Sequence, residues 1–269
     1  MNATISILGC GWYGLPLAKK LVSENYKVNG STTSEAKLAV LKESGISPYL
    51  INLQDEGTEI NTSFFDAQIL IICIPPKRNT SEQKLFSKKI ETIIQLCEHR
   101  VSHVIFISSI SVYGNRNAHF NEFDVPNPDT GSGKMMLEAE EALKNNTNFT
   151  TTVIRFGGLI GPNRDPGRFF AGKENIPNGR APINLILLDD CIDITTKILQ
   201  FKSFGHTYNA CHPDHPAKQW FYTKASSNSL LPAPSFIDEL DSWKVIESEN
   251  VSQILNYKYS IQKWLEWLS

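Results

Sequence analysis

Short apolar runs recur along the chain and alternate with segments in which apolar residues recur at every third or fourth position. The runs predict β-strands at 4–8, 26–29, 48–51, 69–74, 103–107, 151–156 and 207–210. Their nearly continuous apolar character is typical of strands covered on both faces. The periodic segments predict helices at 15–22, 86–97, 135–143 and 190–201. This alternation predicts an α/β fold with a doubly wound parallel sheet.

Three glycines, Gly9, Gly11 and Gly14, follow the first predicted strand and precede the first predicted helix. In this context glycine permits a tight turn, a close approach of the backbone to a pyrophosphate, and close packing of helix on strand. We therefore predict a dinucleotide site rather than a glycine turn without a ligand. Its candidate residues, from this loop and from the ends of the next strands, are Gly9, Cys10, Gly11, Trp12, Tyr13, Gly14, Thr32, Thr33, Asn52, Ile74 and Pro75.

The charge and the cysteine content of the chain indicate which classes of ligand and which compartment are expected. The formal net charge is −2, and the basic residues are scattered, which argues against nucleic acid or a membrane surface and favours a small-molecule substrate. The five cysteines form no CxxC pair and lie mostly in apolar runs, as in a cytoplasmic protein with reduced thiols. The first strand begins within a few residues of Met1, so we expect no leader and no membrane span. His206, His212 and His215 are interpreted as loop residues rather than a metal site.

The segment 106–114, Phe-Ile-Ser-Ser-Ile-Ser-Val-Tyr-Gly, resembles the SSxxVYG signature of extended short-chain dehydrogenase/reductases of the epimerase/dehydratase type. The segment 155–162, Arg-Phe-Gly-Gly-Leu-Ile-Gly-Pro, and the Leu-Asp-Asp-Cys at 188–191 resemble two further elements of that family. Ile-Pro-Pro at 74–76 resembles the same segment in an atypical bacterial subgroup of this family, whose members are loosely called sugar epimerases. The resemblance implies an NAD(P) cofactor and oxidoreductase or epimerase chemistry on a small polar, sugar-like substrate.

The combined prediction is a Rossmann-type domain at 1–160 with a smaller C-terminal substrate lobe at 161–269. The pattern loosens into a Pro/Gly-rich stretch between Gly161 and Pro182, where the lobe begins. Residues from about 183 to 210 are expected to return to the Rossmann sheet. Trp264 and Trp267 belong to a terminal apolar helix face, which we expect to dock on the core, with a homodimer contact as the alternative.

The family's catalytic set is a serine, a tyrosine, and a lysine four positions after the tyrosine. The resemblance places Ser109 and Lys134 in this set, with Lys134 also binding the cofactor ribose, but Thr130 stands where the tyrosine is usual. A threonine hydroxyl is too weak an acid to exchange the substrate proton as the tyrosine does. Tyr113 is a further candidate for that proton transfer, although packing is the commoner role of an aromatic residue in this position.

Three interpretations of these residues stay open. In the first, Ser109 and Thr130 bind a substrate oxygen while another acid or base completes hydride transfer. In the second, the protein binds the cofactor without catalysis and acts as a sensor or regulator. In the third, Lys134 is a solvated helix residue and Ser109 an ordinary hydroxyl at a strand end.

The end of the second strand bears on the choice of nicotinamide. NAD sites place an acidic residue there, whereas NADP sites offer Arg or Lys to the extra phosphate. Small hydroxyl residues occupy this position, and Lys37 follows in the next helix. NADP is therefore the predicted cofactor, and the nearby Glu35 keeps NAD as the alternative.

Charged residues after later strands have two interpretations. Arg155 is expected to support the floor of the site through hydrogen bonds, the alternative being an anion-binding role. Asp189 and Asp190 are expected to cap the helix that follows them, rather than to act as a paired acid and base.

Overall fold

The computed structural model describes residues 3–53, 60–76 and 82–268. Its centre is a seven-stranded sheet in the order β10-β7-β5-β4-β1-β2-β3, in which all neighbouring strands pair in parallel. The seven strands are the predicted ones, so the doubly wound α/β fold is confirmed. They are β1 (Thr4–Leu8), β2 (Lys27–Thr32), β3 (Ser47–Leu50), β4 (Ile69–Ile72), β5 (His103–Ser109), β7 (Thr150–Phe156) and β10 (Thr207–Ala210).

Two strands run further than their apolar pattern predicts. β2 continues through Gly30 to Thr32 because these small residues pair with β3, and Gly30 also pairs with β1. β5 continues to Ser109, which pairs with Phe156 of β7. The expectation that every strand is covered on both faces is wrong for β3, which lies at the sheet edge and has mostly exposed residues.

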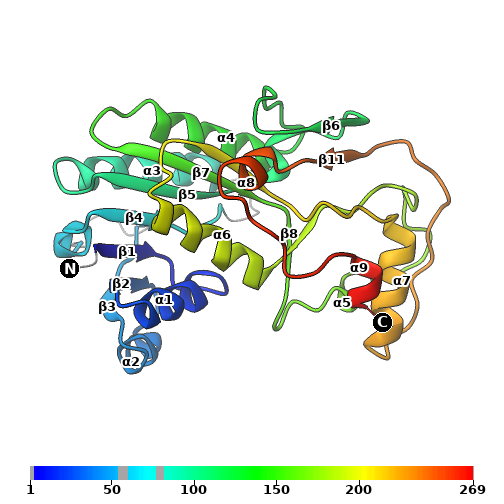
Figure 1. Ribbon diagram of the computed structural model, residues 1–269, viewed down its shortest axis with the longest axis horizontal. Coiled ribbons are helices and arrows are strands. Elements are labelled where there is room, and N and C mark those ends of the chain that lie inside the picture. Colours follow the sequence, from blue (N-terminus) through cyan, green and yellow to red (C-terminus); the bar gives the residue numbers. More distant parts are fainter. Residues whose placement is uncertain (1–2, 54–59, 77–81, 269) are drawn as a thin grey trace.

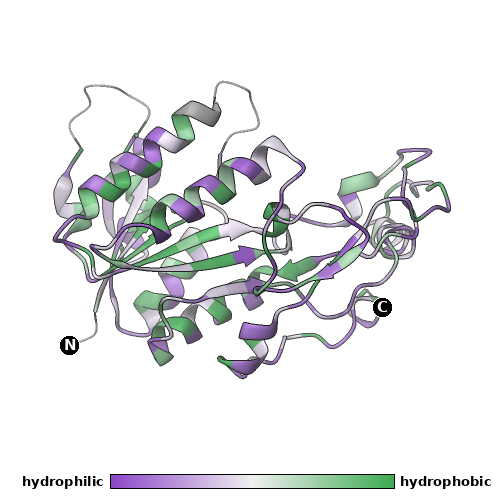
Figure 2. Ribbon diagram, turned by 90° about the horizontal axis from the view of Figure 1, so that it is seen from above, coloured by the Kyte–Doolittle hydropathy of each residue, from purple (hydrophilic) through white to green (hydrophobic). Residues whose placement is uncertain are grey.

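Helices cover both faces of the sheet (Figure 1). One face carries α1 (Gly14–Ser23), α2 (Leu38–Glu43) and α6 (Leu188–Phe201), and the other carries α3 (Glu82–Cys97) and α4 (Gly131–Lys144). In β4, Ile69 and Ile71 join the core beneath α1 and α6, while Leu70 and Ile72 join the core beneath α3 and α4. This alternation is the two-residue period of a strand buried on both sides. Hydrophobic residues accordingly dominate the central strands, and the helices alternate hydrophobic and hydrophilic residues (Figure 2).

A smaller lobe with its own apolar core adjoins one end of the sheet. It contains α5 (Gly167–Phe170), α7 (Lys218–Asn228) and α9 (Trp264–Trp267), and it includes the C-terminus, far from the N-terminus (Figure 1). Trp264 is fully buried among Phe221 and Tyr222, which confirms the expected docking for this residue. Trp267, the other tryptophan of the expected face, is 40% exposed.

Short elements connect the lobe to the sheet. Two pairs of parallel strands lie outside the main sheet: β8 (Gly158–Ile160) with β9 (Leu185–Leu187), and β6 (Ala118–Phe120) with β11 (Lys244–Ile246). The remaining elements are α8 (Glu249–Gln253) and the 3₁₀ turns η1 (Glu35–Lys37), η2 (Thr62–Phe65) and η3 (Ile110–Val112). None of the helices in the described segments has the length and apolar character needed to cross a membrane.

Candidate functional site

A cavity of about 580 Å³ opens at the carboxyl ends of β1, β2, β3 and β4. It gathers eight of the residues that the sequence predicts for cofactor binding: Gly9, Cys10, Gly11, Thr32, Thr33, Asn52, Ile74 and Pro75. The remaining lining residues are Leu8, Ser31, Lys37, Ile51, Leu53, Cys73 and Lys89. Ligands of open α/β sheets bind at this edge, beyond the carboxyl ends of the strands.

Each of the three glycines in the loop after β1 is explained by a different feature of the structure. Gly9 has a φ of +102°, which disfavours any other residue. A Cβ on Gly14 would lie 2.3 Å from the carbonyl oxygen of Gly9, so glycine is needed for α1 to pack against this loop. A Cβ on Gly11 would meet nothing within 4 Å, because Gly11 faces open space. The loop therefore fits a dinucleotide, whose pyrophosphate would approach the backbone at Gly11.

Ser31 holds the glycine-rich loop against β2. Its Oγ accepts a hydrogen bond from the Gly9 N–H at 2.9 Å, and its carbonyl accepts one from the Cys10 N–H at 2.8 Å. Burial raises the pKa of the Cys10 thiol to about 12, against the effect of the backbone hydrogen bond to Ser31, so the thiol stays protonated at neutral pH. Ser31 was not predicted as a supporting residue, because its only signal in the sequence is a small polar residue near the end of a strand.

Trp12 and Tyr13 are not among the lining residues of the cavity, so their contact with a cofactor stays a prediction. The Tyr13 hydroxyl lies 2.7 Å from Thr195 Oγ1 of α6, in the core between α1 and α6. Trp12 Nε1 donates a hydrogen bond of 2.6 Å to the carbonyl of Pro162, and the Arg164 guanidinium lies 4.3 Å from the centre of the indole. The side chain of Tyr13 therefore points toward α6, and that of Trp12 points toward the turn that contains Pro162 and Arg164.

The charge of the cavity lining is positive among the residues that the structure describes. Lys37, which follows β2 as the sequence suggested, and Lys89 of α3 both contribute to the lining. Glu35 is exposed and is not among the lining residues, and none of the described lining residues is acidic. Lys89 is a residue that the sequence analysis missed, because it lies within an amphipathic helix pattern.

A second corner forms where the end of β5 meets the start of α4. Ser109 caps η3, and its Oγ accepts a hydrogen bond from the Ser111 N–H at 3.1 Å. Thr130 caps α4, and its Oγ1 accepts one from the Gly133 N–H at 3.1 Å. A Cβ on Gly133 would lie 2.2 Å from the Ser111 carbonyl oxygen, so the first turn of α4 packs directly on η3. The turn that Ser109 caps and the helix that Thr130 caps are therefore in contact.

Lys134 lies in the first turn of α4, beside this corner, and is exposed. Its side chain forms no hydrogen bond or ion pair with any residue in the described ranges, and it does not line the cofactor cavity. The predicted contact with the cofactor ribose therefore has no counterpart among the cavity-lining residues.

Tyr113 does not have the geometry of a proton-transfer residue, which corrects that candidate assignment. Its side chain is fully buried, and its hydroxyl lies 2.8 Å from the Asn121 carbonyl oxygen and 2.6 Å from Nη1 of Arg155. Burial raises the pKa of Tyr113, although the neighbouring Arg155 acts in the opposite direction. The hydroxyl is therefore protonated at neutral pH and engaged with the protein.

Arg155 has the supporting role that the sequence favoured. Its guanidinium forms a buried ion pair with Glu140 of α4, with 2.6 Å between Nη2 and Oε2. Ser108 Oγ donates a further hydrogen bond of 2.5 Å to the same carboxylate. The pair thus ties α4 to the ends of β5 and β7. Glu140 gave no sequence signal, because its partner lies 15 residues away on a strand.

Lys244 of β11 supports the corner from the C-terminal part of the chain. Its Nζ donates to the carbonyl of Ile110 at 3.1 Å and also to the carbonyl of Tyr113. Burial lowers the pKa of Lys244, while Asp129 and Cys211 act in the opposite direction. This contact joins residues more than 130 positions apart, so no local sequence pattern predicts it.

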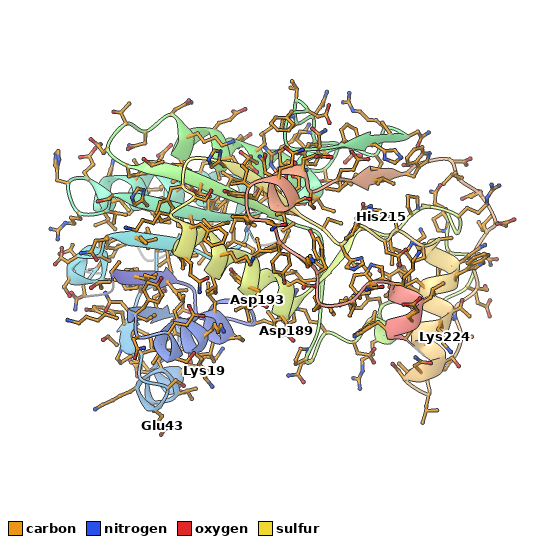
Figure 3. The ribbon with its side chains drawn as sticks, viewed as in Figure 1. Lys19, Glu43, Asp189, Asp193, His215 and Lys224 are labelled. Carbon is orange, nitrogen blue, oxygen red and sulfur yellow. The ribbon has the colours of Figure 1, made fainter. Side chains whose placement is uncertain are left out.

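The predicted capping role of Asp189 and Asp190 is wrong. α6 begins at Leu188 without a side-chain cap, so both residues lie inside its first turn. Figure 3 labels Asp189 and Asp193 along this helix. Asp190 is fully buried, and its Oδ1 accepts hydrogen bonds from the Tyr257 hydroxyl at 2.7 Å and the Ser260 N–H at 2.8 Å. Asp190 therefore fixes the C-terminal segment against α6.

The histidines behave as loop residues. His212 Nε2 and His215 Nδ1 lie 3.0 and 2.8 Å from the backbone carbonyl oxygens of Ile261 and Ile183. His215 lies in the connection before α7 (Figure 3). Within the part of the chain that the structure describes, no three His, Cys, Asp or Glu residues are grouped as metal ligands.

The parallel sheet with a glycine-rich loop at its first strand defines a nucleotide-binding α/β protein. Residues 9–184 match the family model described as NAD(P)H-binding, and the chain belongs to this family. Protein YeeZ of Escherichia coli (strain K12) is 34% identical over 261 residues, which cover 95% of each chain.

Solved structures share the fold. A functionally unknown conserved protein from Silicibacter pomeroyi DSS superposes with a TM-score of 0.81 at 19% identity, covering 99% of this chain and 97% of that one. UDP-glucuronic acid 4-epimerase from Bacillus cereus, in complex with NAD, gives 0.79 at 17% identity, covering 96% and 92%. A putative NAD-dependent epimerase/dehydratase from Methylobacillus flagellatus gives 0.75 at 21% identity, covering 99% and 96%. The fold expected from the short-chain dehydrogenase/reductase resemblance is thus confirmed.

Proposed function

We propose that the protein is an NADP-dependent oxidoreductase or epimerase that acts on a small polar, sugar-like substrate. The observation that carries the proposal is the cavity at the glycine-rich loop, where Gly11 faces open space and Lys37 lines the wall. Membership of the NAD(P)H-binding family supports the cofactor class. The epimerase named among the proteins of the same fold supports the substrate class.

NADP is proposed over NAD because of the side chains at the end of β2. Thr32 and Thr33 occupy the position where NAD sites carry a carboxylate, and they line the cavity together with Lys37. An ammonium group there attracts the 2′-phosphate that distinguishes NADP from NAD. Glu35, the residue that would favour NAD, is outside the lining.

The corner of Ser109 and Thr130 is proposed as the substrate site, between the sheet and the C-terminal lobe. When bound, the nicotinamide would supply or accept a hydride. Ser109 and Thr130 would hold a substrate oxygen by donating their hydroxyl protons, while the same oxygens accept the capping hydrogen bonds of η3 and α4. The Thr130 hydroxyl would then turn from Ser132 Oγ, which lies 3.4 Å away, toward the substrate. Threonine cannot act as the acid at neutral pH, and Tyr113 is buried, so proton exchange falls to Lys134 or to a group of the substrate.

Calorimetric titration of the purified protein with NADPH and NADH tests the cofactor assignment. We expect tighter binding of NADPH, and the variant Lys37→Met should lose this preference while binding NADH as before. Lys42→Met, in the last turn of α2, is the matched control. If neither nucleotide binds, the assignment of the cavity is overturned. Loss of NADPH absorbance at 340 nm with a panel of sugar carbonyl compounds then tests turnover.

A catalytically silent NADP-binding sensor is the second candidate function. The observation that favours it is Thr130, which stands where the family has its tyrosine and which forms a helix cap. A sensor would bind the nucleotide without turnover against any substrate of the panel. Turnover by the wild type that falls in Ser109→Ala would exclude the sensor.

A further inference from the structure

Arg164 is an exposed cation that packs against the glycine-rich loop. Its guanidinium carbon lies 4.3 Å from the centre of the Trp12 indole, and Trp12 directly follows Gly11 in that loop. Within the described ranges the guanidinium forms no ion pair and donates no hydrogen bond. Its positive charge is therefore held beside the loop by stacking on the indole and is available to an anion.

Backbone contacts fix the position of Arg164 relative to the loop. Gly161 and Arg164 donate hydrogen bonds of 3.3 and 2.9 Å to each other's carbonyl oxygens, which closes the turn at 161–164. Trp12 Nε1 donates a hydrogen bond of 2.6 Å to the Pro162 carbonyl of the same turn. A Cβ on Gly161 would lie 3.4 Å from Trp12 Cζ2, so the turn packs closely against the indole. The turn and the loop are therefore joined, although they are 150 positions apart in the chain.

The acidic residue next to Arg164 is engaged elsewhere. Asp165 Oδ1 accepts a hydrogen bond of 2.8 Å from the Gly167 N–H, and its Oδ2 accepts one of 2.8 Å from Ser229 Oγ. The same Oδ2 lies 3.8 Å from Nε of Arg168. Arg168 thus has a carboxylate partner of its own, whereas Arg164 has none among the residues that the structure describes.

The anion that fits this position is a phosphate of the ligand bound at the glycine-rich loop. The diphosphate of a dinucleotide binds over such a loop, on free backbone N–H groups. In the described part of the chain, the N–H groups of Trp12 and Tyr13 donate no hydrogen bond to the protein. Trp12 therefore contributes a free backbone donor and, through its indole, the support for Arg164. Lys37, by contrast, follows β2, where the adenosine ribose binds.

We propose that Arg164 binds the diphosphate of the dinucleotide and so closes the glycine-rich loop from the turn that precedes α5. This inference rests on the proposed nucleotide-binding function and assigns a residue that neither the glycine pattern nor the family resemblance indicated. Arg164 is a determinant of affinity for both nicotinamide dinucleotides. Lys37 is a determinant of the choice between them.

The test is calorimetric titration of the wild type, Arg164→Met and Arg168→Met with NADP⁺ and with NAD⁺, at low and at high salt concentration. Arg168 is the matched control, because it is an exposed arginine four positions further on with its own carboxylate partner. We expect Arg164→Met to weaken both nucleotides about tenfold at low salt and to leave their affinity ratio unchanged. The difference from the wild type should shrink at high salt, because salt screens an exposed charge pair. Arg168→Met should bind like the wild type.

Each outcome decides a different part of the proposal. If the wild type binds neither nucleotide, the proposed function and the role of Arg164 are both overturned. If the wild type binds but Arg164→Met behaves like Arg168→Met, only the role of Arg164 is overturned. A loss of affinity that is the same at low and high salt would also contradict an ionic contact.

A phosphate of the substrate is the other source of such an anion. Titration of the NADPH complex with UDP tests this source in the wild type and in Arg164→Met. We expect the two proteins to bind UDP equally. Weaker binding of UDP by Arg164→Met, together with unchanged affinity for both dinucleotides, would assign Arg164 to the substrate and overturn its contact with the cofactor.

Discussion

The cofactor cavity and the Ser109–Thr130 corner lie along the same edge of the sheet, but different interactions determine their shapes. The glycine-rich loop is shaped by backbone geometry, since Gly9 has a positive φ and Gly14 lies against the Gly9 carbonyl. The corner is shaped by side-chain hydrogen bonds, because the hydroxyls of Ser109 and Thr130 cap η3 and α4.

This difference explains why one site follows the family pattern and the other departs from it. A loop fixed by steric exclusion tolerates few substitutions, because any Cβ at Gly14 would meet a backbone oxygen at 2.3 Å. A helix cap can be provided by several residues, and threonine is among the favoured ones. Thr130 is therefore compatible with the start of α4, where the resemblance expects a tyrosine, because it caps this helix.

The buried pair beneath the corner gives the largest expected effect. Arg155→Met leaves the Glu140 carboxylate buried without its ion-pair partner, which we expect to cost about 3–5 kcal/mol of unfolding free energy. Denaturant unfolding measures this loss. The exposed pair of Lys20 and Glu24 is the control, and Lys20→Met should cost less than about 1 kcal/mol. Equal losses in the two variants would contradict the supporting role of Arg155.

Alanine substitutions at two glycines of the same loop should have different effects, one on the free energy of unfolding and the other on nucleotide binding. Gly14→Ala forces α1 away from Gly9 and is expected to cost about 1–3 kcal/mol of unfolding free energy. Gly11→Ala meets no atom within 4 Å and should leave the unfolding free energy within about 0.5 kcal/mol of the wild type.

Nucleotide titration completes the comparison of these glycines. The methyl group of Gly11→Ala occupies the space where the pyrophosphate approaches, so binding of NADPH should be lost in a fully folded protein. Unchanged affinity in Gly11→Ala would show that the ligand does not contact this loop.

The sequence was sufficient to predict the sheet and its order of elements. Apolar runs such as 69–74 are buried on both faces, so the pattern itself carries the signal. The end of β2 was missed because Gly30, Ser31 and Thr32 have low intrinsic strand preference and are held in the sheet by the pairing of β2 with its neighbours.

The candidate site was predictable only where a local pattern encodes it. The glycine loop and Lys37 were found because they lie in fixed positions relative to a predicted strand. Glu140 and Lys244 were missed because their contacts, with Arg155 and with the carbonyl of Ile110, depend on tertiary packing. The side-chain directions of Trp12 and Tyr13 were also set by the packing of distant segments rather than by the motif.

The cap of α4 offers a smaller and more specific test of the corner. Thr130→Ala removes the acceptor for the Gly133 N–H and should cost about 1 kcal/mol of unfolding free energy. Thr130→Ser keeps the hydroxyl and should stay close to the wild type. Neither variant should change the affinity for NADPH, because Thr130 does not line the cofactor cavity. A change in affinity in Thr130→Ala would show that the two sites depend on one another.

An effect of similar size is expected at the contact that joins the glycine-rich loop to the turn at 161–164. Trp12→Phe removes the hydrogen bond to the Pro162 carbonyl, and the loss should be about 0.5–1.5 kcal/mol. Gly161 and Arg164 donate backbone hydrogen bonds to each other across this turn, so their amide hydrogens should exchange faster in Trp12→Phe. Trp220 is 64% exposed, and Trp220→Phe should change neither quantity. If the exchange rates at Gly161 and Arg164 are the same in both variants, Trp12 does not stabilise the turn.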